Sequence, residues 1–125
     1  RDAFDEILAI LDELNDDRLK GIFHCFTGTL EQAKHILGYG DFYWGIGGVV
    51  TFKKAGLDKV VEQLSINNLV LETDAPYLAP TPFRGKRNEP SYIPHIAEKV
   101  ADLLGLTLKE VAEITTENSK TIFGV

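Results

Sequence analysis

The sequence contains no methionine, a single cysteine and no long apolar run. Because Cys25 has no second cysteine to pair with, an internal disulfide is excluded, which favours a reducing compartment. No stretch is long and apolar enough to predict a membrane span, and the beginning of the chain shows no signal-peptide pattern. We therefore expect a cytoplasmic protein that does not insert into membranes.

Positive charge is also scarce. The chain has 13 lysines and arginines against 19 aspartates and glutamates, which gives a formal net charge of −6. A broad basic surface that attracts nucleic acid is therefore not expected. Any binding to a polyanion must come from a local basic cluster or from a bound metal ion.

The first residues are unusual for a complete gene product. The chain opens on Arg1, a residue too large for ordinary removal of a preceding methionine. An amphipathic helical pattern then begins almost at once over Phe4–Leu14, with Asp2 available as its cap. We expect residues 1–125 to be one domain segment of a longer protein whose N-terminal part is absent.

Strand and helix patterns alternate along the rest of the chain. The predicted strands are Gly21–Phe26, Phe42–Ile46 and Leu69–Leu71. Capping boxes at Thr29 with Gln32 and at Thr107 with Glu110 each predict the start of a helix, and the second helix runs to about Thr115. Two more helices are predicted, one over Leu57–Leu64 and one from a Ser91 cap to Gly105. A short helical turn is expected over Asn118–Phe123. Such alternation predicts an α/β fold with a parallel sheet. Three strands make a poor sheet on their own, so we expect the closing part of a larger (β/α) barrel.

The stretch Leu69–Tyr77 is the centre of the predicted chemistry. An apolar strand leads into Glu72 and Asp74, and Pro76 then stops regular pairing. Carboxylates two residues apart share one face of a strand that continues through them. The C-terminal ends of buried parallel strands are also where barrels place their reactive groups. Glu72 and Asp74 are therefore candidate site residues, with a solvated strand end as the plain alternative.

A histidine lies at the corresponding end of another predicted strand. His24 alternates with Phe23 and Cys25, so it faces the opposite side from them. In a barrel, this strand end opens on the same rim as Asp74. Imidazole nitrogens and carboxylate oxygens are ligands for divalent metals, but a catalytic site needs about three protein ligands.

The segment Ala79–Pro90 is a long polar loop that carries Arg84, Lys86 and Arg87. Long ordered loops are often functional, and these three side chains are candidates for gripping phosphates. The alternative is a solvated loop in which Arg87 pairs weakly with Glu89.

Three aromatic residues pose a similar choice between stacking on nucleobases and packing in the core. They are Trp44, Phe52 and Tyr77. Packing is the interpretation that we favour for all three.

Two segments carry a resemblance to a known family. Gly21-Ile-Phe-His-Cys-Phe-Thr-Gly28 and Leu64-Ser-Ile-Asn-Asn-Leu-Val-Leu-Glu-Thr-Asp-Ala-Pro-Tyr77 resemble signatures of the TatD-type metal-dependent deoxyribonucleases. Arg84-Gly-Lys-Arg-Asn-Glu-Pro90 is similar to the family's loop after its last barrel strand, and Arg1-Asp2-Ala3 looks like the tail of its strand-five segment. Ser65 stands where the family often has proline. The resemblance spans the whole chain and implies strands six to eight of a (β/α)8 TIM barrel of the amidohydrolase-like type.

The resemblance also implies a metal site and a substrate. It makes His24 and Asp74 ligands of divalent metal, with Asp74 also orienting or deprotonating a catalytic water. Glu72 then does not bind the metal itself but orients one of the metal ligands. The alternative is that Glu72 pairs with a buried basic group for structural reasons. The expected cofactor is two divalent ions per complete site, Mg²⁺ first and Mn²⁺ or Zn²⁺ as alternatives, and the expected substrate is DNA. The family's remaining ligands are absent from this sequence.

Two other functions stay open at this stage. The same barrel and metal could hydrolyse an amide or ester, as in an aminoacyl-tRNA deacylase, because fold and ligands do not choose the bond. The chain could instead be an inactive part-barrel that dimerises or needs its missing N-terminal half, since such a piece exposes a strand edge and an apolar face.

Overall fold

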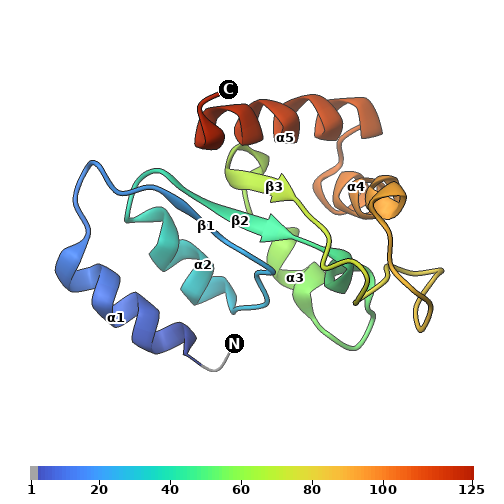
Figure 1. The fold of residues 1–125 in the computed structure, drawn as a ribbon, viewed down its shortest axis with the longest axis horizontal. Coiled ribbons are helices and arrows are strands. Elements are labelled where there is room, and N and C mark those ends of the chain that lie inside the picture. The colour runs from blue at the N-terminus through green and yellow to red at the C-terminus, as the bar shows by residue number, and fades with distance from the viewer. Residues whose placement is uncertain (1–2) are drawn as a thin grey trace.

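The computed structural model describes residues 3–125, and within them a parallel sheet of three strands runs through the middle of the molecule (Figure 1). The strand order is β1-β2-β3. In chain order the elements are α1 (Phe4–Leu14), β1 (Gly21–Phe23), α2 (Leu30–Leu37), β2 (Phe42–Ile46), η1 (Gly48–Thr51), α3 (Leu57–Val61), η2 (Ile66–Asn68), β3 (Leu69–Leu71), η3 (Pro90–Tyr92), α4 (Ile93–Leu104) and α5 (Leu108–Phe123).

The strand register gives the sheet two different faces. Phe23 lies opposite Trp44, and Trp44 opposite Leu69, so these side chains share one face. Trp44 and Leu69 are fully buried there, in one core cluster with residues of the helices. Gly45 lies opposite Val70 on the other face. The helices therefore cover one face of the sheet, as they do on the outside of a barrel.

Both predicted capping boxes are confirmed. Thr29 with Gln32 begins α2, and Thr107 with Glu110 begins α5, each with reciprocal side-chain-to-backbone hydrogen bonds. Gly105 ends α4 in the left-handed conformation. The helix predicted over Phe4–Leu14 is also present, whereas its proposed cap Asp2 and the Arg1–Ala3 similarity involve residues 1 and 2, which lie outside the described residues.

Three helix-boundary predictions are wrong. The helix predicted over Leu57–Leu64 ends at Val61. Ser91 does not cap α4, because the N-cap position is Tyr92 and Ser91 lies in η3, where its hydroxyl donates to Glu89. The C-terminal segment is one helix of 16 residues instead of a helix followed by a short turn. The hydroxyls of Thr115 and Ser119 bond to carbonyls four residues earlier, so these polar residues sit inside the helix without ending it.

Strand β1 is shorter than predicted. It ends at Phe23, and Cys25 has a positive φ of 49°. The Phe26 N–H then donates to the Gly45 carbonyl at 2.9 Å, so the chain returns to the edge of β2 after this turn. The turn carries His24 out of the strand at its C-terminal end.

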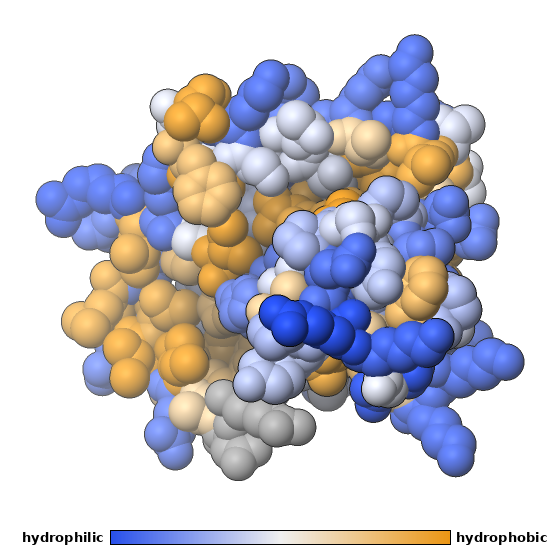
Figure 2. Space-filling model, turned by 45° about the vertical axis from the view of Figure 1, so that its right-hand side comes forward, coloured by the Kyte–Doolittle hydropathy of each residue, from blue (hydrophilic) through white to orange (hydrophobic). Residues whose placement is uncertain are grey.

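Apolar side chains remain exposed on the helix nearest the N-terminus. Ile7, Ile10 and Leu14 of α1 are 45 to 70% exposed. Figure 2 shows apolar side chains gathered over one part of the surface, next to a hollow. Across residues 3–125, no helix combines the length and apolar character needed to cross a membrane.

Candidate metal centre

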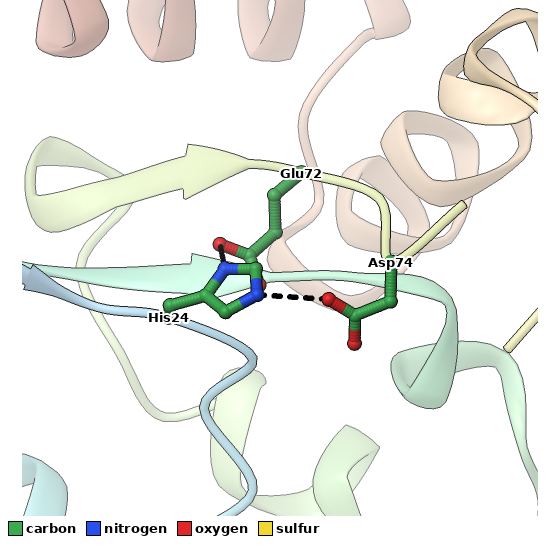
Figure 3. A group of neighbouring side chains, drawn as sticks. All are labelled: His24, Glu72 and Asp74. Carbon is green, nitrogen blue, oxygen red and sulfur yellow. Dashed lines mark hydrogen bonds and ion pairs between the residues drawn. The ribbon is translucent and has the colours of Figure 1, made fainter. Parts of the chain in front are cut away.

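Three side chains from distant parts of the sequence meet at the C-terminal end of the sheet (Figure 3). His24 follows β1, and Glu72 and Asp74 follow β3. The imidazole Nδ1 lies 2.7 Å from Glu72 Oε2, and Nε2 lies 2.8 Å from Asp74 Oδ1. One ligand atom from each residue lies within 4.8 Å of the other two. The structure thus brings together the three residues that the sequence singled out at two separate strand ends.

The position of Glu72 follows from the sheet. Its N–H donates to the Ile46 carbonyl at 3.0 Å, which extends the pairing of β3 with β2 by one residue. Its side chain therefore shares a face with Val70 and lies over Gly45. A Cβ added at Gly45 would clash with Glu72 Oε2 and lie 2.7 Å from Glu72 Cδ. Glycine at position 45 thus leaves the space that the carboxylate occupies.

Backbone and side-chain donors then fix the Glu72 carboxylate. Oε1 accepts a hydrogen bond from the Cys25 N–H, and Oε2 contacts His24. The Glu72 side chain is 14% exposed, against 64% for His24. Among the described residues, the ion-pair partner of Glu72 is thus the His24 imidazole and not a buried lysine or arginine.

The two groups perturb each other's protonation. The hydrogen bond to Glu72 raises the pKa of His24, which partial desolvation opposes, and the charges of Glu72 and Asp74 add to the rise. Burial raises the pKa of Glu72, while the hydrogen bonds from His24 and from the Cys25 N–H oppose that rise. The protonated imidazole donates Nδ1–H to Glu72 and Nε2–H to Asp74. Loss of the Nε2 proton on metal binding would leave Nδ1–H on Glu72 and the Nε2 lone pair available to the ion.

This donor set fits a divalent metal. An imidazole nitrogen and carboxylate oxygens are the ligands used for Zn²⁺, Mn²⁺ and Mg²⁺ in different proportions. His24 Nε2 and Asp74 are the donors that face each other, and Glu72 sits behind the imidazole, as orienting carboxylates do. Within residues 3–125 this is the single such group, so two ions would need donors beyond it.

The loop after β3 brings one basic side chain to the site. Arg84 lines, with His24 and Asp74, a concavity of about 1110 Å³. Its guanidinium carbon lies 4.0 Å from the centre of the Phe52 ring, a cation–π contact that limits its freedom. Lys86 is exposed and does not line the concavity.

Arg87 is exposed as well and does not line the concavity. The alternative pairing of Arg87 with Glu89 is not seen in the part of the chain that the structure describes.

The aromatic candidates separate in the structure. Trp44 is fully buried in the core, as the packing interpretation predicted. The prediction that Tyr77 packs in the core is wrong, because this residue is 73% exposed. Phe52 lies under Arg84.

Sequence reasoning missed two supporting residues, Gly45 and Asn88. A glycine inside the strand pattern Phe42–Ile46 was the available signal for close approach of another group at Gly45. No local signal marked Asn88, which is buried and bonded to the turn after β3.

Comparisons with known proteins identify the family of this chain. The family model described as TatD related DNase matches residues 1–124. The uncharacterized metal-dependent hydrolase YabD of Bacillus subtilis is 47% identical over 126 residues, which cover 100% of this chain and 49% of that protein. The 3'-5' ssDNA/RNA exonuclease TatD of Escherichia coli K12 is 35% identical over 131 residues, with 100% and 50% covered.

A solved structure shows the same fold. The crystal structure of YJJV, a TatD homologue of Escherichia coli K12, superposes with a TM-score of 0.90 at 28% identity, over 100% of this chain and 48% of that one. The chain thus spans about half the length of the relatives that it matches. Its parallel strands and covering helices form part of a TIM barrel, which confirms the predicted fold class, and the chain belongs to the TatD family of metal-dependent hydrolases.

Proposed function

We propose that this chain carries part of the active site of a deoxyribonuclease that hydrolyses DNA phosphodiester bonds with a metal-activated water. The observation that carries the proposal is the meeting of His24, Glu72 and Asp74, with their ligand atoms within 4.8 Å of one another at the rim of the sheet. A divalent ion in such a site polarises a phosphodiester and lowers the pKa of bound water. Mg²⁺ is the first candidate, with Mn²⁺ or Zn²⁺ as alternatives.

Each of the three residues has a distinct role in the proposal. His24 offers Nε2 to the metal while its Nδ1 stays bonded to Glu72. Glu72 fixes the plane and the tautomer of the imidazole, which keeps the lone pair of Nε2 aimed at the site. Asp74 supplies a carboxylate that holds metal and orients or deprotonates the attacking water.

The position of Arg84 is an argument for a substrate that contains phosphate. Arg84 lies in the same concavity as His24 and Asp74, and the ring of Phe52 holds its guanidinium in place. A guanidinium matches the geometry of phosphate oxygens and carries no sequence preference. Lys86 and Arg87 would contact neighbouring phosphates from the exposed part of the loop. An acidic net charge is compatible with this, because metal and Arg84 neutralise charge locally.

The proposed active protein contains a complementary part-barrel. β1 and β3 form the two edges of the sheet in residues 3–125, and α1 leaves Ile7, Ile10 and Leu14 exposed. We propose that the covering segment is either the other half of the same protein or a second copy of this chain. The lone Cys25 supports a cytoplasmic location for the assembly.

The test is a nuclease assay on single-stranded DNA with Mg²⁺, Mn²⁺ or Zn²⁺ added after treatment with a chelator. We expect metal-dependent cleavage that Asp74→Asn abolishes with little change in unfolding. Asp102→Asn, an exposed aspartate on α4, is the matched control and should keep full activity.

Two results would contradict the proposal. Cleavage that persists in Asp74→Asn would remove the assigned role of that carboxylate. Hydrolysis of an aminoacyl-tRNA ester without any cleavage of DNA would show that the substrate is an ester and not a phosphodiester.

A further inference from the structure

Asn88 is a buried polar residue at the end of the long loop after β3. It is 2% exposed, and a buried amide destabilises the fold unless its donors and acceptors are bonded. Its Nδ2 donates to the Tyr77 carbonyl at 2.7 Å, and its Oδ1 accepts from the Glu89 N–H at 2.9 Å. Its own N–H donates to the Pro76 carbonyl at 2.9 Å. Asn88 therefore bonds two successive carbonyls that lie 11 and 12 residues earlier in the chain.

Those two carbonyls belong to the turn that begins at Asp74. The Tyr77 N–H donates to the Asp74 carbonyl at 2.7 Å and closes the turn. Asn88 thus hydrogen-bonds to Pro76 and Tyr77, the last two residues of the turn, and the Tyr77 N–H connects them to the backbone of Asp74. The loop that carries Asn88 is itself anchored, since the Thr81 N–H donates to Thr51 Oγ1 at 2.9 Å.

The Asp74 carboxylate has little other support. In the part of the chain that the structure describes, its bonded partner is His24 Nε2. A metal held by both residues would take the place of that contact. The orientation of Asp74 must then come from its backbone, and the groups that hold this backbone are those of the turn and of Asn88.

We propose that Asn88 is a positioning residue of the metal centre, which holds the turn from Asp74 to Tyr77 so that the Asp74 carboxylate faces His24. The importance of this arrangement for metal rests on the proposed function, whereas the effect of Asn88 on the turn does not. The same residue also joins the basic loop that carries Arg84 to the segment that carries Asp74.

The test compares two isosteric substitutions at opposite ends of β3. Asn88→Asp keeps an acceptor for the Glu89 N–H but places a carboxylate oxygen against the Tyr77 carbonyl, where a donor is needed. Asn118→Asp is the matched control. The Asn118 Nδ2 donates to the Ile66 and Leu69 carbonyls at 2.8 and 2.7 Å, at the beginning of β3 and away from the site.

The first readout is Mn²⁺ affinity of the full chain, measured by electron paramagnetic resonance. We expect Asn88→Asp to weaken Mn²⁺ binding by about tenfold or more, as for other residues that orient metal ligands. Asn118→Asp should bind Mn²⁺ within about twofold of the unchanged chain. The added negative charge would by itself attract a cation, so a loss of affinity in Asn88→Asp cannot come from charge.

The second readout is independent of metal. We expect Asn88→Asp to speed hydrogen exchange of the Tyr77 amide and to change the ¹⁵N signal of His24 Nε2, and Asn118→Asp to leave both unaltered. If the unchanged chain binds no Mn²⁺, the proposed metal function fails while the amide and imidazole signals still decide the role of Asn88. Unaltered Tyr77 exchange in Asn88→Asp, or equal effects of the two substitutions on every signal, would overturn the inference.

Discussion

Replacing Gly45 with alanine tests whether the space behind the metal centre is needed. No positive φ is found at Gly45, so alanine can adopt its strand backbone, and by lowering the entropy of the unfolded chain it would by itself stabilise by about 0.4–1 kcal/mol. The new methyl group, however, would clash with Glu72 Oε2 and lie 2.7 Å from Glu72 Cδ. Carbon atoms pack at about 3.5–4.0 Å, so the carboxylate must move by roughly 1 Å.

The magnitude follows from what that movement breaks. Overpacking in a closed site destabilises by about 1–3 kcal/mol. The displaced carboxylate also loses its contacts with His24 Nδ1 and the Cys25 N–H, and hydrogen bonds to charged groups are each worth about 1.5–3 kcal/mol. We expect a net loss of stability of about 2 kcal/mol, because some of these contacts re-form in the shifted position. Metal affinity should fall by about 10-fold to 100-fold, since the imidazole loses the group that orients it.

Gly47→Ala is the matched control for Gly45→Ala. A Cβ at Gly47 would meet Glu72 at 3.6 and 3.8 Å, which is ordinary contact. Urea unfolding gives the stability of each variant, and Mn²⁺ titration followed by electron paramagnetic resonance gives its metal affinity. The reasoning is refuted if Gly45→Ala binds Mn²⁺ as tightly as Gly47→Ala, because the carboxylate would then have found a harmless alternative position.

Two further predictions concern other charged residues. Hydrogen bonds from His35 and then from Tyr39 lower the pKa of Asp12 below its usual 3.8, so Asp12 contributes stability above that pH and loses it as the pH falls through the lowered value. Asp12→Asn should flatten the acid side of the stability profile in urea unfolding between about pH 2 and 5, and an equal change in the exposed Asp17→Asn would contradict this. Arg84→Gln should weaken binding of single-stranded DNA several-fold and reduce its salt dependence, whereas Arg18→Gln, at an exposed arginine outside the concavity, should not.

Local patterns in the sequence were sufficient to predict most elements of the fold. The alternating strands, the capping boxes at Thr29 and Thr107 and the left-handed end at Gly105 each depend on residues close together in the chain. The α5 boundary was wrong because Thr115 and Ser119 can either end a helix or bond back to it, and only their surroundings decide. The end of β1 depends on the positive φ of Cys25, a residue with no local preference for it.

The candidate site divides in the same way. His24, Glu72 and Asp74 could be found because strand ends in parallel α/β folds face one rim, so residue type and position were enough. Arg84, Lys86 and Arg87 were predicted together as phosphate-binding candidates, and the sequence could not tell which of them lines the concavity. The contact that selects Arg84 is with Phe52, 32 residues earlier in the chain, which no local pattern encodes.

The geometry of the candidate metal centre depends as much on uncharged residues as on the three side chains that could hold the ion. On one side, Gly45 leaves space for Glu72, and the Cys25 N–H fixes that carboxylate against His24. On the other side, Asn88 holds the turn that presents Asp74. His24 contacts both carboxylates, so a shift on either side is transmitted through the imidazole to the other. The geometry is therefore a property of segments far apart in the chain that meet around one imidazole. A metal held by His24 and Asp74 would replace the contact between them and leave the contact of His24 with Glu72 in place.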